Sequence, residues 1–220
     1  NKLKKKPNKN NRLYNKGLGG GAILDLGCYP VSFSILIASL ISKFALDKTK
    51  ILNQKKEIGP TGVDMNSFAE LNFENNFKST VGASLTQNLG KKTKIIGTKG
   101  ELILEDTWSP TNLSSIKITG ENKEIIEIGC HNNIYTYEID ILSKCILENK
   151  KEPNFPGMTI NETFENMRIM KGNRLPYISL MTEAEPLFVK SSSKFFPVGA
   201  KKTKMEVPSK KRQNPSKDNV

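Results

Sequence analysis

An aspartate and a tyrosine four residues apart are the side chains in this sequence best suited to chemistry. Asp25 and Tyr29 lie in the stretch AILDLGCYP, which spans residues 22–30. On a helical turn, side chains at this spacing point the same way. A carboxylate can orient a neighbouring phenol or shift its acidity, and a phenol can exchange a proton with a hydroxyl or carbonyl. The spacing also permits two simpler roles, with Asp25 capping a helix and Tyr29 serving as a half-buried core aromatic.

Glycines precede this pair in the order Gly17-Leu18-Gly19-Gly20-Gly21-Ala22, which spells the G-x-G-x-x-A of a dinucleotide-binding loop. That motif works only where a buried strand runs into the first glycine and an acidic residue ends a second strand about 20 residues later. Residues 10–16 are polar, and the acid at the right distance, Asp47, lies in DKTK rather than at the end of a strand. We therefore assign no cofactor-binding residue here. The glycines are predicted to form a close-packed entry to Asp25 and Tyr29.

The elements around this pair follow from hydrophobic spacing. Apolar residues recur at helical spacing from Ala22 to Phe44, and Pro30 suits the first turn of a helix. We predict a short turn around Asp25 and a main helix from about Pro30.

Alternating apolar and polar residues then predict three antiparallel hairpins, over 63–87, 94–105 and 115–128. The helical period returns over 133–149, and a capping box at Thr159–Glu162 begins another helix over 160–171. Strands gathered between helices predict an α+β fold, with an open, mainly antiparallel sheet covered on one face by helices.

The charge of the chain is concentrated at its ends. The formal net charge is +12 over 220 residues. Residues 1–16 contain bases and no acids, and the end of the chain is also basic. We predict a disordered basic lead-in over 1–16, a folded domain over 17–177 and a disordered basic tail over 178–220. Neither end alternates aromatic residues with its bases, so nucleic acid is not the expected partner, although binding through the basic ends stays open as a minor hypothesis.

Cysteine and histidine content bounds the chemistry further. Cys28, Cys130 and Cys145 form no C-x-x-C pair and His131 is the single histidine, so no metal site is predicted. Free thiols and the lack of a signal-peptide pattern favour the cytoplasm. The apolar run Val31–Ile41 is too short to span a bilayer, so no membrane association is expected.

The stretch from Asn11 to Ser32 resembles the entry to the C-terminal domain of the Gfo/Idh/MocA oxidoreductases. Members of that family have the signature GGG(A)-x-x-D-x-G-x-(H/Y) at this position. The resemblance extends over about residues 11–177. It includes the strand pair, a GTKGEL-like turn at Gly97–Leu102, a Tyr-x-x-Glu-Ile helix at Tyr135–Ile139 and a Pro-Gly-Met-Thr helix entry at 156–159.

The resemblance implies a function. In this family an N-terminal Rossmann domain binds NAD or NADP, and the C-terminal domain supplies an open sheet, part of the substrate pocket and often the subunit interface. It implies that Tyr29 moves the hydroxyl proton while Asp25 holds a substrate hydroxyl. A tyrosine at this position, rather than a histidine, is similar to the dihydrodiol/xylose dehydrogenase and glucose–fructose oxidoreductase branches. The implied substrate is a sugar, polyol or dihydrodiol, and the implied assembly is a homo-oligomer through the sheet.

One departure from the family pattern is large. The family's Rossmann glycine loop and its Glu-Lys-Pro segment, whose lysine assists catalysis, lie upstream of the signature, and neither is in this sequence. We therefore expect the Rossmann domain to be absent from this chain, and the isolated chain to be inactive. The alternative is a non-catalytic dimerisation or binding module, a remnant of the family.

Overall fold

The computed structural model describes residues 8–41, 48–74, 76–110, 113–121, 123–129 and 133–172. Contacts divide the chain into two units, Asn1–Tyr177 and Ile178–Val220. The predicted basic tail and the residues Cys130 and His131 lie outside the described residues.

The first unit begins and ends with helices. Two 3₁₀ turns and a π-helix lead into the first α-helix, and two further α-helices follow the strands: η1 (Arg12–Tyr14), η2 (Lys16–Leu18), η3 (Ile23–Gly27), α1 (Cys28–Ile41), α2 (Ile134–Leu147) and α3 (Ile160–Gly172). The predicted capping box starts α3. The Thr159 amide donates to Glu162 Oε2 at 2.7 Å, and the Glu162 amide donates to Thr159 Oγ1 at 3.2 Å.

The strands confirm the α+β class but form two antiparallel sheets. The first has the order β1–β2–β3 and the second the order β4–β5–β6–β7. Their bounds are β1 (Lys50–Ile58), β2 (Asp64–Asn72), β3 (Lys78–Ser84), β4 (Thr93–Gly97), β5 (Gly100–Leu104), β6 (Leu113–Gly120) and β7 (Glu124–Gly129). All three predicted hairpins are present, as β2–β3, β4–β5 and β6–β7.

Strand β1 is the element that the sequence pattern missed. Its sequence, KILNQKKEI, does not alternate, and eight of its nine residues are exposed. Its pairing with β2 is interrupted between Leu52 and Lys55, where Asn53 has a φ of 47°. A bulged edge strand has no fully buried face, so hydrophobic period gives no signal for it.

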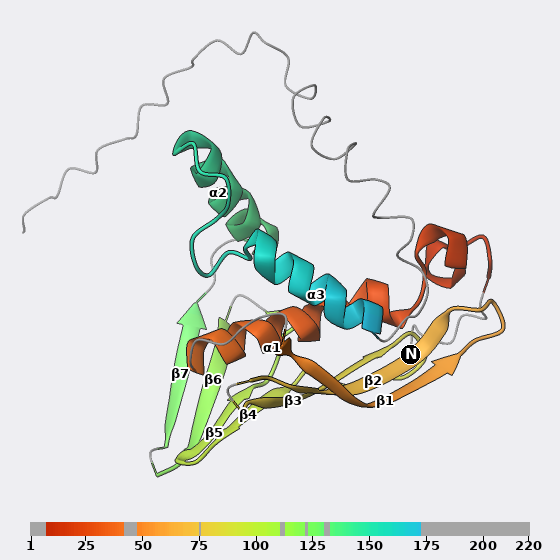
Figure 1. Ribbon diagram of the computed structural model, residues 1–220. Coiled ribbons are helices and arrows are strands. Elements are labelled where there is room, and N and C mark those ends of the chain that lie inside the picture. Colours follow the sequence, from red (N-terminus) through yellow and green to blue (C-terminus); the bar gives the residue numbers. More distant parts are fainter. Residues whose placement is uncertain are drawn as a thin grey trace, which may run out of the picture. The chain divides into compact units, whose positions relative to one another are not determined.

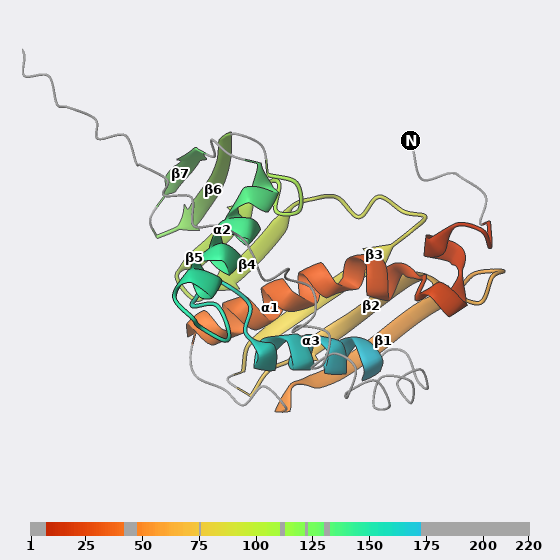
Figure 2. The ribbon, with the colours of Figure 1, turned by 90° about the horizontal axis from the view of Figure 1, so that it is seen from above.

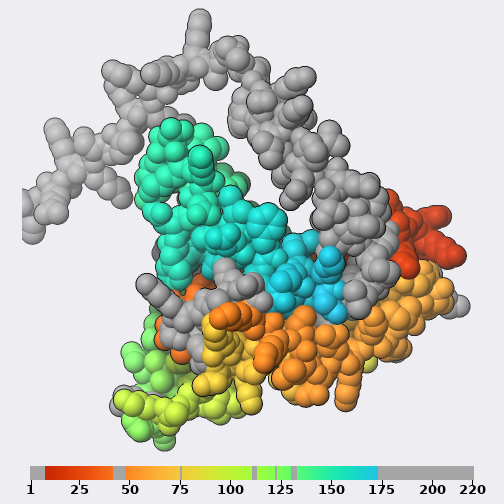
Figure 3. All heavy atoms as spheres, in the orientation of Figure 1, coloured from red at the N-terminus to blue at the C-terminus, as the bar shows by residue number. Residues whose placement is uncertain are grey.

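Helices α1 and α3 cover one face of the three-stranded sheet (Figures 1 and 2). Figure 3 shows α3 seated directly on the β1 side of that sheet, where Gly172 lies so close to Ile51 that an added Cβ would meet its Cδ1. The core between these layers comprises Val31, Ile35, Ala38, Ala69, Leu71, Phe73, Val81 and Ile169. Burial of these side chains fixes α1, and with it the turn that precedes α1, against the sheet.

The lead-in prediction is corrected for residues 8–16. This segment forms the turns η1 and η2, each capped by an asparagine side chain, and it buries Tyr14. Tyr14 packs in a second core cluster with Ala22, Val63 and Met65. A single buried aromatic and local Asx caps order a segment whose composition is otherwise polar.

The helical stretch Lys16–Ile41 has 26 residues and contains an 18-residue window with a mean hydropathy of 1.7, so it could cross a membrane by length and composition alone. It extends beyond the run Val31–Ile41 on which the sequence expectation was based. In this fold α1 buries Val31, Ile35 and Ala38 against the sheet, as the core helix of a folded domain does.

Helix α2 leaves its apolar residues largely uncovered. None of its residues is buried: Ile141 and Cys145 are half-buried, while Ile134 and Tyr137 are exposed. A second stripe, comprising Tyr135, Ile139, Leu142 and Ile146, is exposed throughout.

Candidate active site

Asp25 and Tyr29 occupy a short π-helix and the helix that continues it. Asp25 lies within η3, and Tyr29 is the second residue of α1. In a π-helix the hydrogen bond spans five residues rather than four, so each turn is wider. Single π-helical turns are rare and are frequently found at functional sites. The predicted turn around Asp25 is therefore present, in a form that hydrophobic spacing does not distinguish from an α-helix.

Asp25 does not cap the helix in which it lies. Its Oδ1 accepts from Arg12 Nη2 at 2.5 Å, and its side chain is 21% exposed. The ion pair joins η1 to η3 through Oδ1. Among the described residues, this contact with Arg12, and not a helix cap, is the structural role of Asp25.

The capping role belongs to Asp64 at the start of β2. The Ile23 amide donates to Asp64 Oδ2 at 2.6 Å, in the interior of the protein. At the other end, Asn166 of α3 donates from Nδ2 to the Cys28 carbonyl at 3.0 Å. Sequence reasoning missed Arg12, Asp64 and Asn166, because nothing local marks them as neighbours of residues 23–29.

Tyr29 is a surface residue and not a core aromatic, since it is 60% exposed. Its pKa is raised above the ordinary value of 10, first by the neighbouring Cys28 thiol and then by partial desolvation, with smaller contributions from Tyr135, Asp25 and Glu138. These neighbours are acidic or apolar, and each disfavours the phenolate. Tyr29 is therefore a protonated phenol throughout the neutral range, poised to donate a proton.

Cys28 lies directly before Tyr29 and is also held in its neutral form. Burial raises the pKa of its thiol above 9, and Asp25 raises it further, although backbone hydrogen bonds act in the opposite direction. Because the thiolate is the reactive form, this cysteine is a poor nucleophile and a poor metal ligand at neutral pH. Among the described residues, no cluster of three or more His, Cys, Asp or Glu side chains could hold a metal ion.

The glycine loop does not fit a dinucleotide phosphate. The amides of Gly19, Gly20 and Gly21 donate to the carbonyls of Lys16, Asn15 and Leu13, at 3.3, 2.9 and 2.8 Å. A phosphate cradle needs such amides free and pointed at the ligand. Gly20 instead allows the lead-in to pack closely, because a Cβ there would lie 2.5 Å from the Arg12 carbonyl oxygen.

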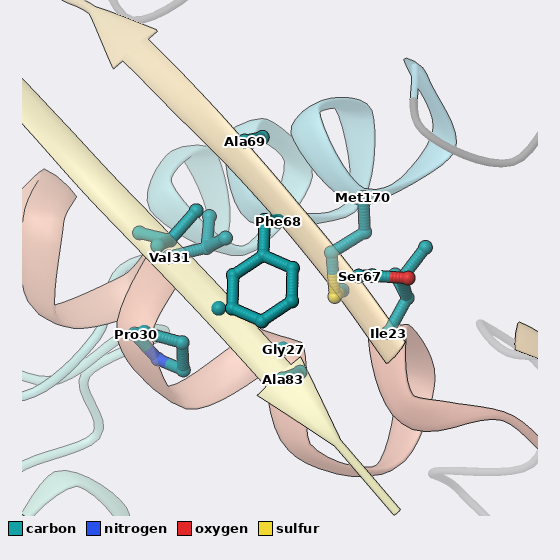
Figure 4. A pocket seen from close by; sticks show the side chains of 11 residues that line it. Ile23, Gly27, Pro30, Val31, Ser67, Phe68, Ala69, Ala83 and Met170 are labelled. Atoms are coloured by element: carbon teal, nitrogen blue, oxygen red, sulfur yellow. The ribbon is translucent and has the colours of Figure 1, made fainter. Parts of the chain in front are cut away.

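A shallow apolar hollow lies beneath η3, between the start of α1 and strands β2 and β3 (Figure 4). Its lining includes Ile23, Pro30, Val31, Ala83 and Met170, and neither Asp25 nor Tyr29 contributes to it. A polar substrate would find almost no hydrogen-bonding group there. The chemistry available to this site is therefore on the outer side of η3, where Tyr29 is exposed.

Two later segments approach the same stretch of α1. The ring of Trp108 meets Phe33 edge to face, with centroids 5.9 Å apart. Ser32 donates to the sulfur of Met158 at 3.7 Å. These contacts bring the connection after β5 and the entry to α3 beside the signature, a juxtaposition that sequence reasoning did not predict.

Comparison with known proteins agrees with this architecture. Residues 2–103 match the GFO/IDH/MocA C-terminal domain family. The chain is 29% identical over 159 residues to the trans-1,2-dihydrobenzene-1,2-diol dehydrogenase of Xenopus tropicalis, covering 69% of this chain and 46% of that relative. The enzyme of the same name from Mus musculus is 29% identical over 140 residues, covering 60% of this chain and 39% of the relative. The chain thus spans less than half the length of these relatives.

Solved structures share the fold. A 3-ketoreductase from Actinomadura kijaniata, in complex with NADP and TDP-benzene, superposes with a TM-score of 0.59 at 16% identity, covering 75% of this chain and 47% of that one. An aldose-aldose oxidoreductase from Caulobacter crescentus, complexed with glycerol, gives a TM-score of 0.56 at 15% identity, covering 76% and 48% of the two chains.

Proposed function

We propose that this chain supplies the substrate side of an NAD- or NADP-dependent oxidoreductase, because residues 2–103 match the GFO/IDH/MocA C-terminal domain family. The substrate is a hydroxyl compound of the sugar, polyol or dihydrodiol class. Relatives of the chain carry the name dihydrodiol dehydrogenase, and its structural neighbours include a ketoreductase and an aldose oxidoreductase.

One observation carries the proposal: Asp25 and Tyr29 lie four residues apart on continuous helical backbone with both side chains accessible to solvent, and Asp25 does not cap η3 while Tyr29 does not pack in the core. Asp64 caps η3 in place of Asp25, and Tyr29 is exposed rather than packed in the core. An oriented carboxylate beside a protonated phenol suits recognition of a hydroxyl and proton transfer to a carbonyl oxygen.

The proposed step divides proton and hydride between two partners. When bound, a nicotinamide ring accepts or returns the hydride at C4. In reduction, Tyr29 gives its phenolic proton to the carbonyl oxygen as the carbonyl carbon gains the hydride, and in oxidation the tyrosinate takes the hydroxyl proton back. Asp25 holds a second substrate hydroxyl through the carboxylate oxygen that Arg12 does not bind.

The cofactor must be held by a part other than the glycine loop, whose amides are engaged by carbonyls. A cation near Tyr29 would assist oxidation, because the described neighbours that shift the phenol all raise its pKa. We propose that a nicotinamide-binding domain provides both the cofactor and that cation, and that the chain alone is inactive.

The test joins this chain to the nicotinamide-binding domain of a related dehydrogenase and measures turnover on a panel of dihydrodiols, sugars and polyols. We expect activity that Tyr29→Phe reduces by about 10²-fold or more, the contribution of one acid–base group. Tyr137→Phe, which removes an exposed phenol from α2, is the matched control and should leave turnover unchanged. Near-normal turnover in Tyr29→Phe would exclude the catalytic role, and micromolar NADPH binding by the chain alone would contradict the absence of a cofactor site.

A second function is favoured by the uncovered face of the three-stranded sheet. Leu52 and Phe68 are exposed on the strand faces opposite the helices, and Leu89 is exposed nearby. We propose that this face joins two copies of the chain. If the assembled protein lacks dehydrogenase activity, a non-catalytic dimerisation module becomes the better description.

A further inference from the structure

Two buried polar side chains from distant segments bind the backbone at the two ends of η3. Asp64 is 3% exposed and accepts from the Ile23 amide, where η3 begins. Asn166 is 5% exposed and donates to the carbonyl of Cys28, where η3 ends. The two residues come from β2 and α3, so the turn is held between the sheet and a helix packed on that sheet.

The turn needs such support because its own sequence provides none. The first amides of any helix lack partners within the helix, and Ala22, at the N-cap position of η3, contributes no side-chain hydrogen bond. A carboxylate at this end satisfies an amide and complements the positive end of the helix dipole. A π-turn is also an uncommon local geometry that surrounding contacts must maintain.

Asp25 and Tyr29 sit within and immediately after the segment so held. The two bonds fix the backbone at Ile23, two residues before Asp25, and at Cys28, directly before Tyr29. If either bond were lost, η3 could move relative to α1, and Asp25 would shift relative to Tyr29.

We infer that Asp64 and Asn166 are positioning residues, which hold η3 in place between β2 and α3 and so keep Asp25 and Tyr29 directed at one substrate. Neither side chain touches the substrate in this scheme. The catalytic consequence rests on the proposed function, whereas the control of the turn does not.

Asn166 offers a clean test because of how it is bonded. Its Nδ2 makes the bond to Cys28, while its buried Oδ1 has no hydrogen-bond partner among the described residues. Asn166→Leu therefore removes the donated hydrogen bond, which destabilises the fold, and also removes the unpaired buried acceptor, which stabilises it. Asp64→Asn is the conservative partner, since an amide oxygen can still accept from Ile23, whereas Asp64→Ala removes the acceptor.

The experiment measures hydrogen exchange of backbone amides in the full chain, comparing residues 23–29 with Val81 and Ala83 of β3. We expect exchange in 23–29 to accelerate about five- to tenfold in Asn166→Leu and Asp64→Ala, on the scale of one lost hydrogen bond. Asp64→Asn should stay near wild type, and β3 should be unaffected in Asn166→Leu. Unchanged exchange at 23–29, or equal acceleration in β3, would overturn the inference.

A second readout separates positioning from folding. In the assembly with a nicotinamide-binding domain, Asn166→Leu should lower kcat about tenfold without lowering the melting temperature, because misplacement of an acid–base group affects the chemical step. If exchange changes as expected but Tyr29→Phe remains fully active, the proposed function fails while control of the turn stands. If Tyr29→Phe is inactive but Asn166→Leu has wild-type exchange and kcat, only the positioning inference fails.

Discussion

At the scale of residues, the surroundings of Tyr29 raise the pKa of its phenol although the side chain is exposed. An exposed phenol would ordinarily titrate near 10, but the Cys28 thiol, partial desolvation and nearby acidic groups raise its pKa. The protonated form is ready for reduction of a carbonyl. Oxidation of an alcohol needs the phenolate, so its rate should rise with pH until the phenol has titrated, while reduction stays flat through the neutral range.

This account predicts the effect of removing those neighbours. Cys28→Ser should lower the pKa of Tyr29 toward 10, because it removes the group with the largest effect, and Asp25→Asn should lower it less. Following the ring carbon Cζ of Tyr29 by NMR from neutral to high pH measures both. Cys145→Ser, in α2, is the matched control. A rise in pKa in either variant would contradict the assigned causes.

At the scale of elements, the lead-in, the glycine loop and η3 form one continuous packed unit. Tyr14 anchors the lead-in in the core, and the Leu13 carbonyl accepts from the Gly21 amide. Arg12, in the turn η1 of the same lead-in, forms the ion pair with Asp25. Gly20 is required because its Cα faces two carbonyls of the lead-in at a distance that leaves no room for a side chain.

Gly20→Ala is accordingly expected to destabilise the chain by about 2 kcal/mol, the typical cost of an added methyl group in a packed site. Its Cβ would lie 2.5 Å and 2.6 Å from the carbonyl oxygens of Arg12 and Leu13. Urea unfolding measures the change. Gly97→Ala is the control, since its Cβ would have an ordinary contact of 3.7 Å. Equal stability of the two variants would show that the lead-in moves aside without penalty.

At the scale of the whole molecule, the described part leaves large apolar side chains uncovered on more than one element. The sheet face opposite α1 and α3 exposes Phe68, and α2 exposes the stripe through Tyr135 and Ile139. Apolar surface of this kind marks interaction sites. The chain also spans less than half the length of the relatives that it matches, and we propose that these uncovered faces contact a second copy of the chain or another domain.

Assembly through the sheet face is directly testable. Phe68 lies against Gly82, its partner on β3, where an added Cβ would meet the ring at 2.8 Å. We expect the wild-type chain to sediment as a dimer and Phe68→Lys to sediment as a monomer, because the charge would be buried unpaired. Leu147→Lys, at an 86% exposed position on α2, should leave the dimer intact. A wild-type monomer at high concentration would exclude this interface.

Local patterns in the sequence were enough to determine most helices and hairpins and the capping box at Thr159–Glu162. They also singled out Asp25 and Tyr29, whose chemical role stays a prediction. Each of these depends on residues within a few positions of one another, where helical or strand period acts directly. The edge strand β1 lacked that period, because a bulged strand exposed on most of its length buries no regular face.

Only the tertiary structure decided how the pair is held. Arg12, Asp64 and Asn166 lie 13, 41 and 138 residues from the groups that they bind. Packing of the sheet and helices brings these distant residues together, and no periodic pattern in the sequence marks them as neighbours. The glycines of GLGGGA also show what local sequence leaves open. Their spacing matches a phosphate loop, whereas in the fold their amides donate to carbonyls of the lead-in.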